Sequence, residues 1–347
     1  MNLLNLQNVN FSYDDFKLSN IDFSLESGNT LGLFGPSGSG KSTILKLIAG
    51  LAQPSSGDIL LNNNSIITVS PELRKIGMIF QTHALFPHLN VFENIAFGLK
   101  MKKMDKNQIF DEVTELLDLL NISHLKSRHV SELSTGESQR VAIARSLAPR
   151  PKLLLMDEPF SSLDNSLKIS LRAEISNIFH NLGISAIIVS HDILDIVPFT
   201  SNILFIDNGI IVDKRNLQDI YSNPISTASA KMLGFISLNT IFAMQYTFNN
   251  FKEVFLNNNP KLHDFSEINI CAHPEIMTAS DDKIKNSIAL KCVVVKSFYP
   301  GPNLFVTLKI IDSQEIIATN VRWVSKKVPY NGQHVFLCLV KEDLKII

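Results

Sequence analysis

The sequence has only three cysteines and no long apolar run, and its charges nearly cancel. No apolar run approaches the roughly 18 residues of a membrane-spanning helix, so we expect no such helix. The N-terminus lacks the basic and then apolar segments of a secretory signal. The net charge of −1 excludes a general electrostatic attraction to nucleic acid or anionic lipid. At 347 residues the chain is long enough for two domains.

The cysteines do not form a recognisable metal or disulfide pattern. Cys271, Cys292 and Cys338 are odd in number, widely spaced and confined to the last third of the chain. Neither zinc ligands nor a disulfide framework have this spacing. We therefore expect buried thiols in a reducing cytosol.

The most informative segment that is present is rich in glycine. Gly35–Ser42 reads GPSGSGKS and fits G-x-x-x-x-G-K-[ST], the phosphate-binding loop. The apolar run 30–34 predicts a buried strand before it, and 42–49 predicts a helix after it, closed by Gly50. Lys41 can reach the β- and γ-phosphates, and the Ser42 hydroxyl can bind Mg²⁺. The residues of this segment that we assign to ATP binding are Gly35, Pro36, Ser37, Gly38, Ser39, Gly40, Lys41, Ser42 and Thr43.

Two acidic residues narrow the reaction. A phosphate loop alone leaves kinases, GTPases and ATPases open. The run 152–158 predicts an apolar strand that ends in Asp157 and Glu158. In nucleotide hydrolases the first acid holds Mg²⁺, and an adjacent carboxylate can activate the attacking water. We therefore assign Asp157 to Mg²⁺ and Glu158 to general base catalysis.

A histidine follows the next predicted strand. The apolar run 185–190 ends at His191. The carboxyl ends of parallel strands form the edge where such folds bind ligands. We therefore expect His191 to contact both the γ-phosphate and the Glu158 carboxylate.

A third motif lies between the phosphate loop and the acidic strand. Leu133–Arg140 reads LSTGESQR, and a helical pattern follows over 141–147. The chain here resembles the ATP-binding cassette (ABC) ATPases, whose signature is LSGGQ or LSGGE. The resemblance covers roughly residues 1–235, with every expected motif in order. It implies an α/β P-loop cassette, in which a mixed sheet carries a helical subdomain at about residues 84–148.

The resemblance also assigns roles to single residues. Gln81 matches the Q-loop glutamine, which contacts Mg²⁺ and water. Tyr13 matches the aromatic residue that stacks on adenine, and residues 161–164, ending in Asp164, match the D-loop. His191 matches the switch histidine of the family.

The resemblance further implies a homodimer that encloses two ATP molecules. The signature of one copy completes the phosphate site of the other, at the positive start of a helix. Its residues are Ser134, Thr135, Gly136 and Glu137. Thr135 stands where the family most often has glycine, and a β-branched residue would be strained there if the backbone needed a positive φ.

The segment 83–99 resembles the stretch that meets the membrane subunit in bacterial solute importers. The implied partners are two transmembrane permease subunits and an extracytoplasmic substrate-binding protein, with no nucleic acid. The implied location is the cytoplasmic face of the inner membrane, where the chain is a peripheral subunit.

The last part of the chain, 236–347, predicts a second domain. Alternating apolar residues at 288–294, a turn at 300–303 and the runs 304–308 and 335–340 indicate short strands. This pattern resembles the transport-associated OB-like (TOBE) domain of importer ATPases, an all-β barrel. Ala272–Glu275 is similar to the R-P-E turn of that domain, with His273 in place of arginine. The implied role is dimerisation or regulation.

The transported substrate does not contact an ATPase subunit of this kind, so no motif in the sequence identifies it directly. The runs 147–151 and 158–164 look slightly more like the iron(III) and inorganic-ion importers, which gives a lean toward ion transport. Polyamine, sugar, sulfate and molybdate importers are the alternatives within this branch. An exporter subunit is a further alternative, and a soluble ABC ATPase acting on ribosomes or DNA is the alternative from another class.

Overall fold

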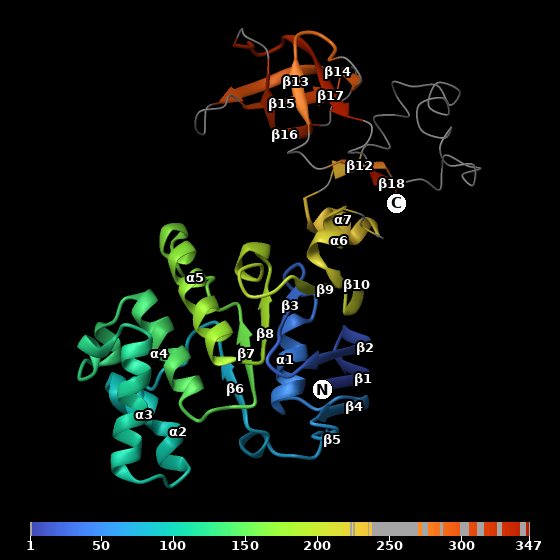
Figure 1. The fold of residues 1–347 in the computed structure, drawn as a ribbon. Helices are drawn as coiled ribbons and strands as arrows, with labels where there is room; N and C mark the ends of the chain where they lie inside the picture. Colours follow the sequence, from blue (N-terminus) through green and yellow to red (C-terminus); the bar gives the residue numbers. More distant parts are fainter. Residues whose placement is uncertain are drawn as a thin grey trace. The chain divides into compact units, whose positions relative to one another are not determined.

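The computed structural model divides the chain into two units, residues 1–218 and 219–347, each of which is described by itself (Figure 1). This division falls before the boundary at 235 and 236 that the sequence suggested, and the domain limits of the cassette stay a prediction. The structure describes residues 2–222, 224, 226–234, 236–237, 270–272, 277–284, 287–298, 305–310, 316–324, 328–340 and 345–346.

The first unit is built around a six-stranded sheet of order β10-β9-β3-β8-β7-β6. Only β10 runs antiparallel to its neighbour. Strand β8 is buried along its whole length, and β3 and β7 are buried at all but one residue each, as expected for parallel strands covered on both faces. The strands are β3 (Thr30–Phe34), β6 (Ile76–Ile79), β7 (Leu153–Asp157), β8 (Ala186–Ser190), β9 (Asn202–Asp207) and β10 (Ile210–Asn216).

A second, antiparallel sheet has the order β2-β1-β4-β5. Helix α1 (Lys41–Ala49) lies between the two sheets, and residues of all three elements form one buried apolar cluster. This cluster includes Leu6 of the second sheet, Leu45 of α1 and Leu155 of β7. The strands of the second sheet are β1 (Asn2–Tyr13), β2 (Phe16–Glu26), β4 (Ser56–Leu61) and β5 (Asn64–Ser65).

Three helices form a group beside β6 (Figure 1). They are α2 (Val91–Met101), α3 (Lys106–Leu119) and α4 (Thr135–Leu147). Ile109, Val113 and Leu117 are buried and recur at helical spacing, so they form one apolar face of α3. A longer helix, α5 (Asn165–Leu182), follows β7.

The segment after His191 contains Pro198, and a proline inside a helix kinks or ends it. The structure has only a 3₁₀ turn, η4 (Ile193–Asp195), which ends before the proline. The other 3₁₀ turns of this unit are η1 (Pro71–Leu73), η2 (Ser123–Leu125) and η3 (Val130–Glu132).

The second unit contains a closed barrel in which β13 joins β16 and β17. Inside it, Leu290, Cys292 and Val294 alternate on one face of β14, as the sequence predicted. The thiols of Cys292 and Cys338 are buried and free, and burial raises the pKa of Cys292 to about 12. The barrel strands are β13 (Thr278–Ser280), β14 (Ser287–Phe298), β15 (Phe305–Ile310), β16 (Ile316–Trp323) and β17 (His334–Val340).

The remaining described elements precede or flank the barrel in sequence. They are α6 (Leu217–Ser222), α7 (Thr227–Met232), β11 (Ile236–Ser237), β12 (Ile270–Ala272) and β18 (Lys345–Ile346). The predicted turn at 300–303 and the motif residues 273–275 lie outside the described residues. Within the described part of the chain, no helix has both the length and the apolar character needed to span a membrane.

Candidate functional site

The glycine-rich loop leaves the carboxyl end of β3 and leads into α1. Gly38 and Gly40 have φ values of 81° and 107°, which L-residues with side chains rarely adopt. A Cβ on Gly40 would also approach the Leu18 side chain to 2.4 Å. No side chain caps the start of α1, and its first turn carries no acidic residue. The amide groups of this helix start are therefore available to an anion.

Lys41, the first residue of α1, is held inside the loop. Its Nζ donates hydrogen bonds of 2.8 Å to the carbonyls of both Gly35 and Pro36. Burial lowers the pKa of Lys41, while the carboxylates of Glu158 and Asp157 act in the opposite direction. The ammonium group thus lies at the loop, facing the acidic edge of the sheet.

Helix α1, which follows the loop, contacts the end of strand β7 directly. The Ser42 hydroxyl donates to Asp157 Oδ1 over 2.7 Å. A hydroxyl beside a carboxylate is the kind of oxygen pair that Mg²⁺ prefers. The buried Ser39 hydroxyl of the same loop has no protein partner, which leaves it for a ligand oxygen. These groups fit a nucleotide phosphate with its Mg²⁺.

Glu158 and His191 lie in contact, as the sequence predicted. The His191 amide donates to Glu158 Oε1 over 3.1 Å, and its Nδ1 lies 2.9 Å from the same oxygen. The Glu158 backbone adopts a left-handed φ of 49°, and its carbonyl accepts from Ser161 Oγ over 2.9 Å. This unfavourable backbone conformation turns the carboxylate from the end of β7 toward β8.

The signature residues form the start of α4. Ser134 caps the helix in a reciprocal box with Glu137, whose pKa is lowered by the hydrogen bond from the Ser134 amide. Thr135 is exposed and does not have a positive φ, so its branched side chain causes no backbone strain. A Cβ on buried Gly136 would approach Leu167 to 2.7 Å. Helix α4 begins at Thr135 and so includes most of the signature, whereas the sequence pattern predicted a helix only from 141.

The other predicted site residues are distributed around this edge. Gln81 is exposed and follows the end of β6. Asp164 caps α5 by accepting from the Leu167 amide over 3.0 Å, a bond that lowers its pKa. Tyr13 is 69% exposed at the tip of the first hairpin, where it is the cross-strand partner of Phe16.

Phe16 is a candidate site residue that no motif of the sequence indicated. A cavity of about 230 Å³ beside the loop is lined by Phe16, Gly38, Gly40, Lys41, Ser42 and Thr43. Because cross-strand partners place their side chains on the same face, the Tyr13 and Phe16 rings lie on one side of the hairpin. Phe16 follows Tyr13 closely in the sequence, and a second aromatic residue near Tyr13 could have indicated its place in the site.

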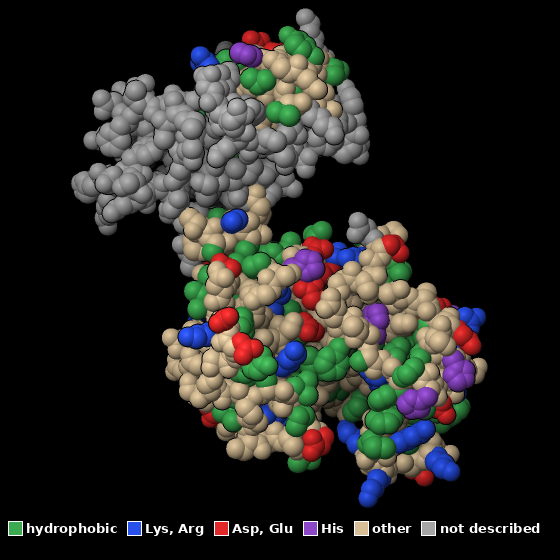
Figure 2. Space-filling view, turned by 180° about the vertical axis from the view of Figure 1, so that it is seen from behind, with side chains coloured by type: hydrophobic (Ala, Val, Ile, Leu, Met, Phe, Trp, Pro, Cys, Tyr) green, Lys and Arg blue, Asp and Glu red, His purple; other side chains and the backbone are tan. Residues whose placement is uncertain are grey.

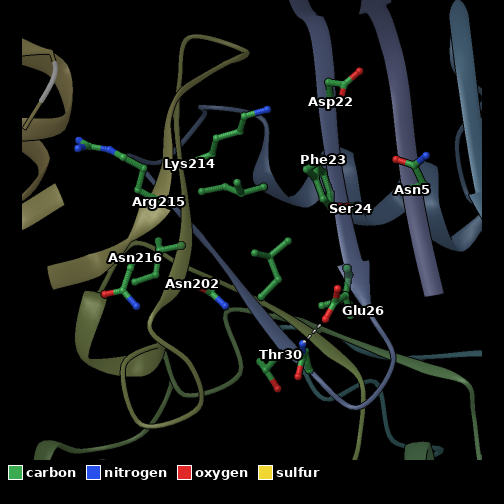
Figure 3. Close-up of a pocket in the computed structure, with 15 residues that line it drawn as sticks. Asn5, Asp22, Phe23, Ser24, Glu26, Thr30, Asn202, Lys214, Arg215 and Asn216 are labelled. Carbon is green, nitrogen blue, oxygen red and sulfur yellow. Dashed lines mark hydrogen bonds between the residues drawn. The ribbon is translucent and has the colours of Figure 1, made fainter. Parts of the chain in front are cut away.

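A larger cavity lies elsewhere in the first unit. It has a volume of about 490 Å³, and Figure 3 shows Asp22, Lys214 and Asn202 around it. Its lining includes Thr30 at the start of β3 and Asn202 at the start of β9. It therefore lies at the amino ends of these strands, away from the edge where the loop and acids meet.

The distribution of charged side chains on the surface agrees with the net charge of −1. Figure 2 shows acidic and basic side chains interspersed on the coloured part of this face, without a broad basic patch.

Comparisons with known proteins agree with the site. The family described as "ABC transporter" matches residues 18–161. The spermidine/putrescine import ATP-binding protein PotA of Thermotoga maritima is 40% identical over 232 residues, which are 67% of this chain and 63% of PotA. The glucose import ATP-binding protein GlcV of Saccharolobus solfataricus is 36% identical over 338 residues, 95% of this chain and 93% of GlcV. Neither name supports the lean toward iron(III).

Solved structures show the same fold. CbiO1 of Clostridium perfringens, part of an ABC transporter complex, has a TM-score of 0.59 and 30% identity, covering 64% of this chain and 91% of CbiO1. The dimeric cassette MJ0796 bound to ADP and Pi has a TM-score of 0.56 and 28% identity, covering 62% of this chain and 98% of MJ0796. The chain belongs to the ABC transporter family and is one of its ATP-binding subunits, an ATPase.

Proposed function

We propose that this chain hydrolyses Mg²⁺–ATP as a homodimer and thereby drives the import of a small organic solute through membrane permease subunits. The observation that carries the proposal is the convergence of two contacts on one sheet edge. Ser42 meets Asp157 at 2.7 Å, and the His191 amide meets Glu158 at 3.1 Å. The first contact fits phosphate and metal binding, and the second fits hydrolysis.

Phosphate binding falls to the loop and to Lys41. The amide groups at the start of α1 have no side-chain cap and favour the binding of an anion. The Lys41 ammonium, which contacts the carbonyls of Gly35 and Pro36, exchanges these for the β- and γ-phosphate oxygens. Tyr13 and Phe16 provide aromatic surface for the adenine at the hairpin tip.

Ser42 and Asp157 would hold Mg²⁺, with Gln81 as a further oxygen ligand. When bound, the metal neutralises charge on the phosphate oxygens. Gln81 follows β6 and Asp157 ends β7, and these strands are parallel neighbours. Their carboxyl ends therefore bring both side chains to the same edge of the sheet.

Glu158 acts as the general base. Its carboxylate accepts a proton from the water whose oxygen attacks the γ-phosphorus, while the bond from that phosphorus to the β-phosphate oxygen breaks. The His191 amide and Nδ1 orient the carboxylate from one side. His191 is 55% exposed in its side chain, so the ring can also contact the γ-phosphate.

A second copy completes the site. Ser134 and Thr135 are exposed at the start of α4, where a helix N-terminus favours negative charge. MJ0796, with which this chain shares the cassette fold, has a dimeric structure. In the proposed assembly the signature residues Ser134, Thr135, Gly136 and Glu137 meet the ATP held by the opposite chain.

The names of two relatives support a proposal for the partners and cargo. PotA is named for polyamine import and GlcV for glucose import, and the match to GlcV runs through 95% of this chain. We therefore propose a polyamine or sugar as substrate, delivered by an extracytoplasmic binding protein to two permease subunits. The chain itself is peripheral on the cytoplasmic face, and the barrel acts as a TOBE-type domain in dimerisation or regulation.

The test is co-purification from native membranes solubilised in detergent. Tagged E158Q protein is captured with Mg²⁺ and ATP, which hold the ATP-bound state, and its partners are identified by mass spectrometry. A multi-spanning permease is the expected partner, and transport of labelled polyamine and sugar by that complex then identifies the cargo. Recovery of ribosomes or DNA-associated proteins without a permease would overturn the importer proposal. Wild-type protein with EDTA is the control.

A further inference from the structure

A series of buried polar contacts leads from α5 to the Glu158–His191 pair. Arg172 lies on α5 and its side chain is only 8% exposed. Its Nε donates to Asp195 Oδ1 over 2.8 Å, and its Nη2 donates to Asp192 Oδ2 over 2.9 Å. One guanidinium group therefore bridges two carboxylates of the segment that follows β8.

Ser190 connects this ion pair to the site. The second oxygen of the buried Asp195 carboxylate accepts from Ser190 Oγ over 2.6 Å. Ser190 Oγ also accepts from the Asp192 amide over 3.0 Å and lies 3.4 Å from Glu158 Oε2. Because a hydroxyl has one proton, the shorter distance assigns that proton to Asp195. Ser190 Oγ is thereby held by the Asp195 carboxylate and the Asp192 amide, at the end of β8 and directly before His191.

The same contacts define the turn that carries His191. Asp192 caps the start of the 3₁₀ turn η4 and Asp195 is its last residue, and Arg172 holds both. The His191 amide, at the start of the turn, donates to Glu158 Oε1 over 3.1 Å. Loss of the guanidinium would release the turn, and the amide and ring of His191 would move together relative to Glu158.

Charge and shape both require arginine at this position. Asp195 is 1% exposed, and a carboxylate buried to this degree needs a charged or hydrogen-bonded partner. Bridging two separate carboxylates uses the planar fork of a guanidinium, which a lysine ammonium does not reproduce. Arg172 is also on the helix that begins directly after Asp164, so the network links the D-loop helix to the hydrolytic pair.

We propose that Arg172 is a positioning residue for Glu158 and His191, acting through Asp195 and Ser190. The proposal rests on the roles proposed above for Glu158 and His191. It adds the prediction that the rate of hydrolysis depends on a side chain that does not touch the nucleotide.

The test compares R172K and S190A with R215K in the purified full chain. R215K is a matched control, because Arg215 forms a two-pronged pair with buried Asp213, at 2.9 and 2.7 Å, on β10. We expect kcat of R172K and S190A to fall about 10- to 100-fold, as for a misplaced catalytic group, with ATP affinity unchanged. R215K keeps the wild-type kcat.

Double variants distinguish positioning from a general structural effect. If Arg172 acts through Glu158, then R172K causes no further loss in single-turnover rate when added to E158Q. A multiplied loss in R172K/E158Q, or a wild-type kcat in S190A, would overturn the proposal. S190A leaves the pairs of Arg172 with Asp192 and Asp195 intact, so it tests the role of Ser190 even where R172K fails to fold. A wild-type rate in E158Q alone would instead overturn the proposed role of Glu158.

Discussion

The Ser42 hydroxyl and the Asp157 carboxylate, 115 positions apart in the chain, form a hydrogen bond of 2.7 Å. One residue belongs to the first turn of α1 and the other ends β7. The contact joins the phosphate loop to the acidic edge of the sheet. Binding and hydrolysis of the nucleotide therefore share one structural junction.

Replacing Asp157 with asparagine removes a negative charge from that junction while keeping its shape. We expect the Mg²⁺ concentration for half-maximal ATPase activity to rise at least about tenfold, since a lost metal ligand weakens metal binding. The measurement is a Mg²⁺ titration of the hydrolysis rate at saturating ATP. D111N, at an exposed position of α3, is the control. An unchanged titration would exclude Asp157 as a metal ligand.

Replacing Lys41 with alanine removes the ammonium group that faces the phosphates. We expect ATP affinity to fall about 10- to 100-fold, the usual contribution of a hydrogen bond to a charged group. Equilibrium binding of a fluorescent ATP analogue measures the effect. K46A, at an exposed position of the same helix, should bind normally. Equal affinities of K41A and wild type would contradict the assignment of the loop.

Replacing Thr135 with glycine restores the residue most common in the family. Because Thr135 is exposed and does not have a positive φ, we expect the ATPase rate to stay within about twofold of wild type. Steady-state phosphate release measures it. A tenfold loss would mean that the threonine side chain contacts the nucleotide or the partner chain.

Replacing Arg74 with methionine tests the support of the loop helix. The Arg74 guanidinium donates to the carbonyls of Leu47 and Ile48 at 2.9 Å each and to Val69 at 2.8 Å, so it caps the end of α1. Leaving these buried carbonyls without donors should lower the free energy of unfolding by about 2–3 kcal/mol. Urea unfolding measures it, with the exposed R150M as control. Equal stability would show that water replaces the guanidinium.

Local sequence patterns predicted the elements that bear the site. The apolar run 30–34 and the glycine Gly50 predicted β3 and the end of α1, because a strand and a left-handed helix cap each have a local signal. The start of α4 was placed too late, at 141. Its polar first turn hides the helix, although Ser134 and Glu137 form a capping box that a sequence can show.

Other features depended on contacts between distant segments. The position of Phe16 beside the loop follows from the pairing of β1 with β2. The network of Arg172 joins a helix to a turn beyond the next strand, and no spacing rule relates Arg172 to Asp195. Such contacts are set by tertiary packing, so sequence periodicity does not reveal them.

The most direct test of the account is the single-turnover hydrolysis rate of E158Q at saturating Mg²⁺ and ATP. Glutamine keeps the size of Glu158 but does not accept a proton from the attacking water. We predict a rate lower by about 10² to 10⁴ with ATP affinity retained, the usual effect of losing a positioned base. Hydrolysis at the wild-type rate would contradict the account, because the carboxylate held by His191 would then not be the base.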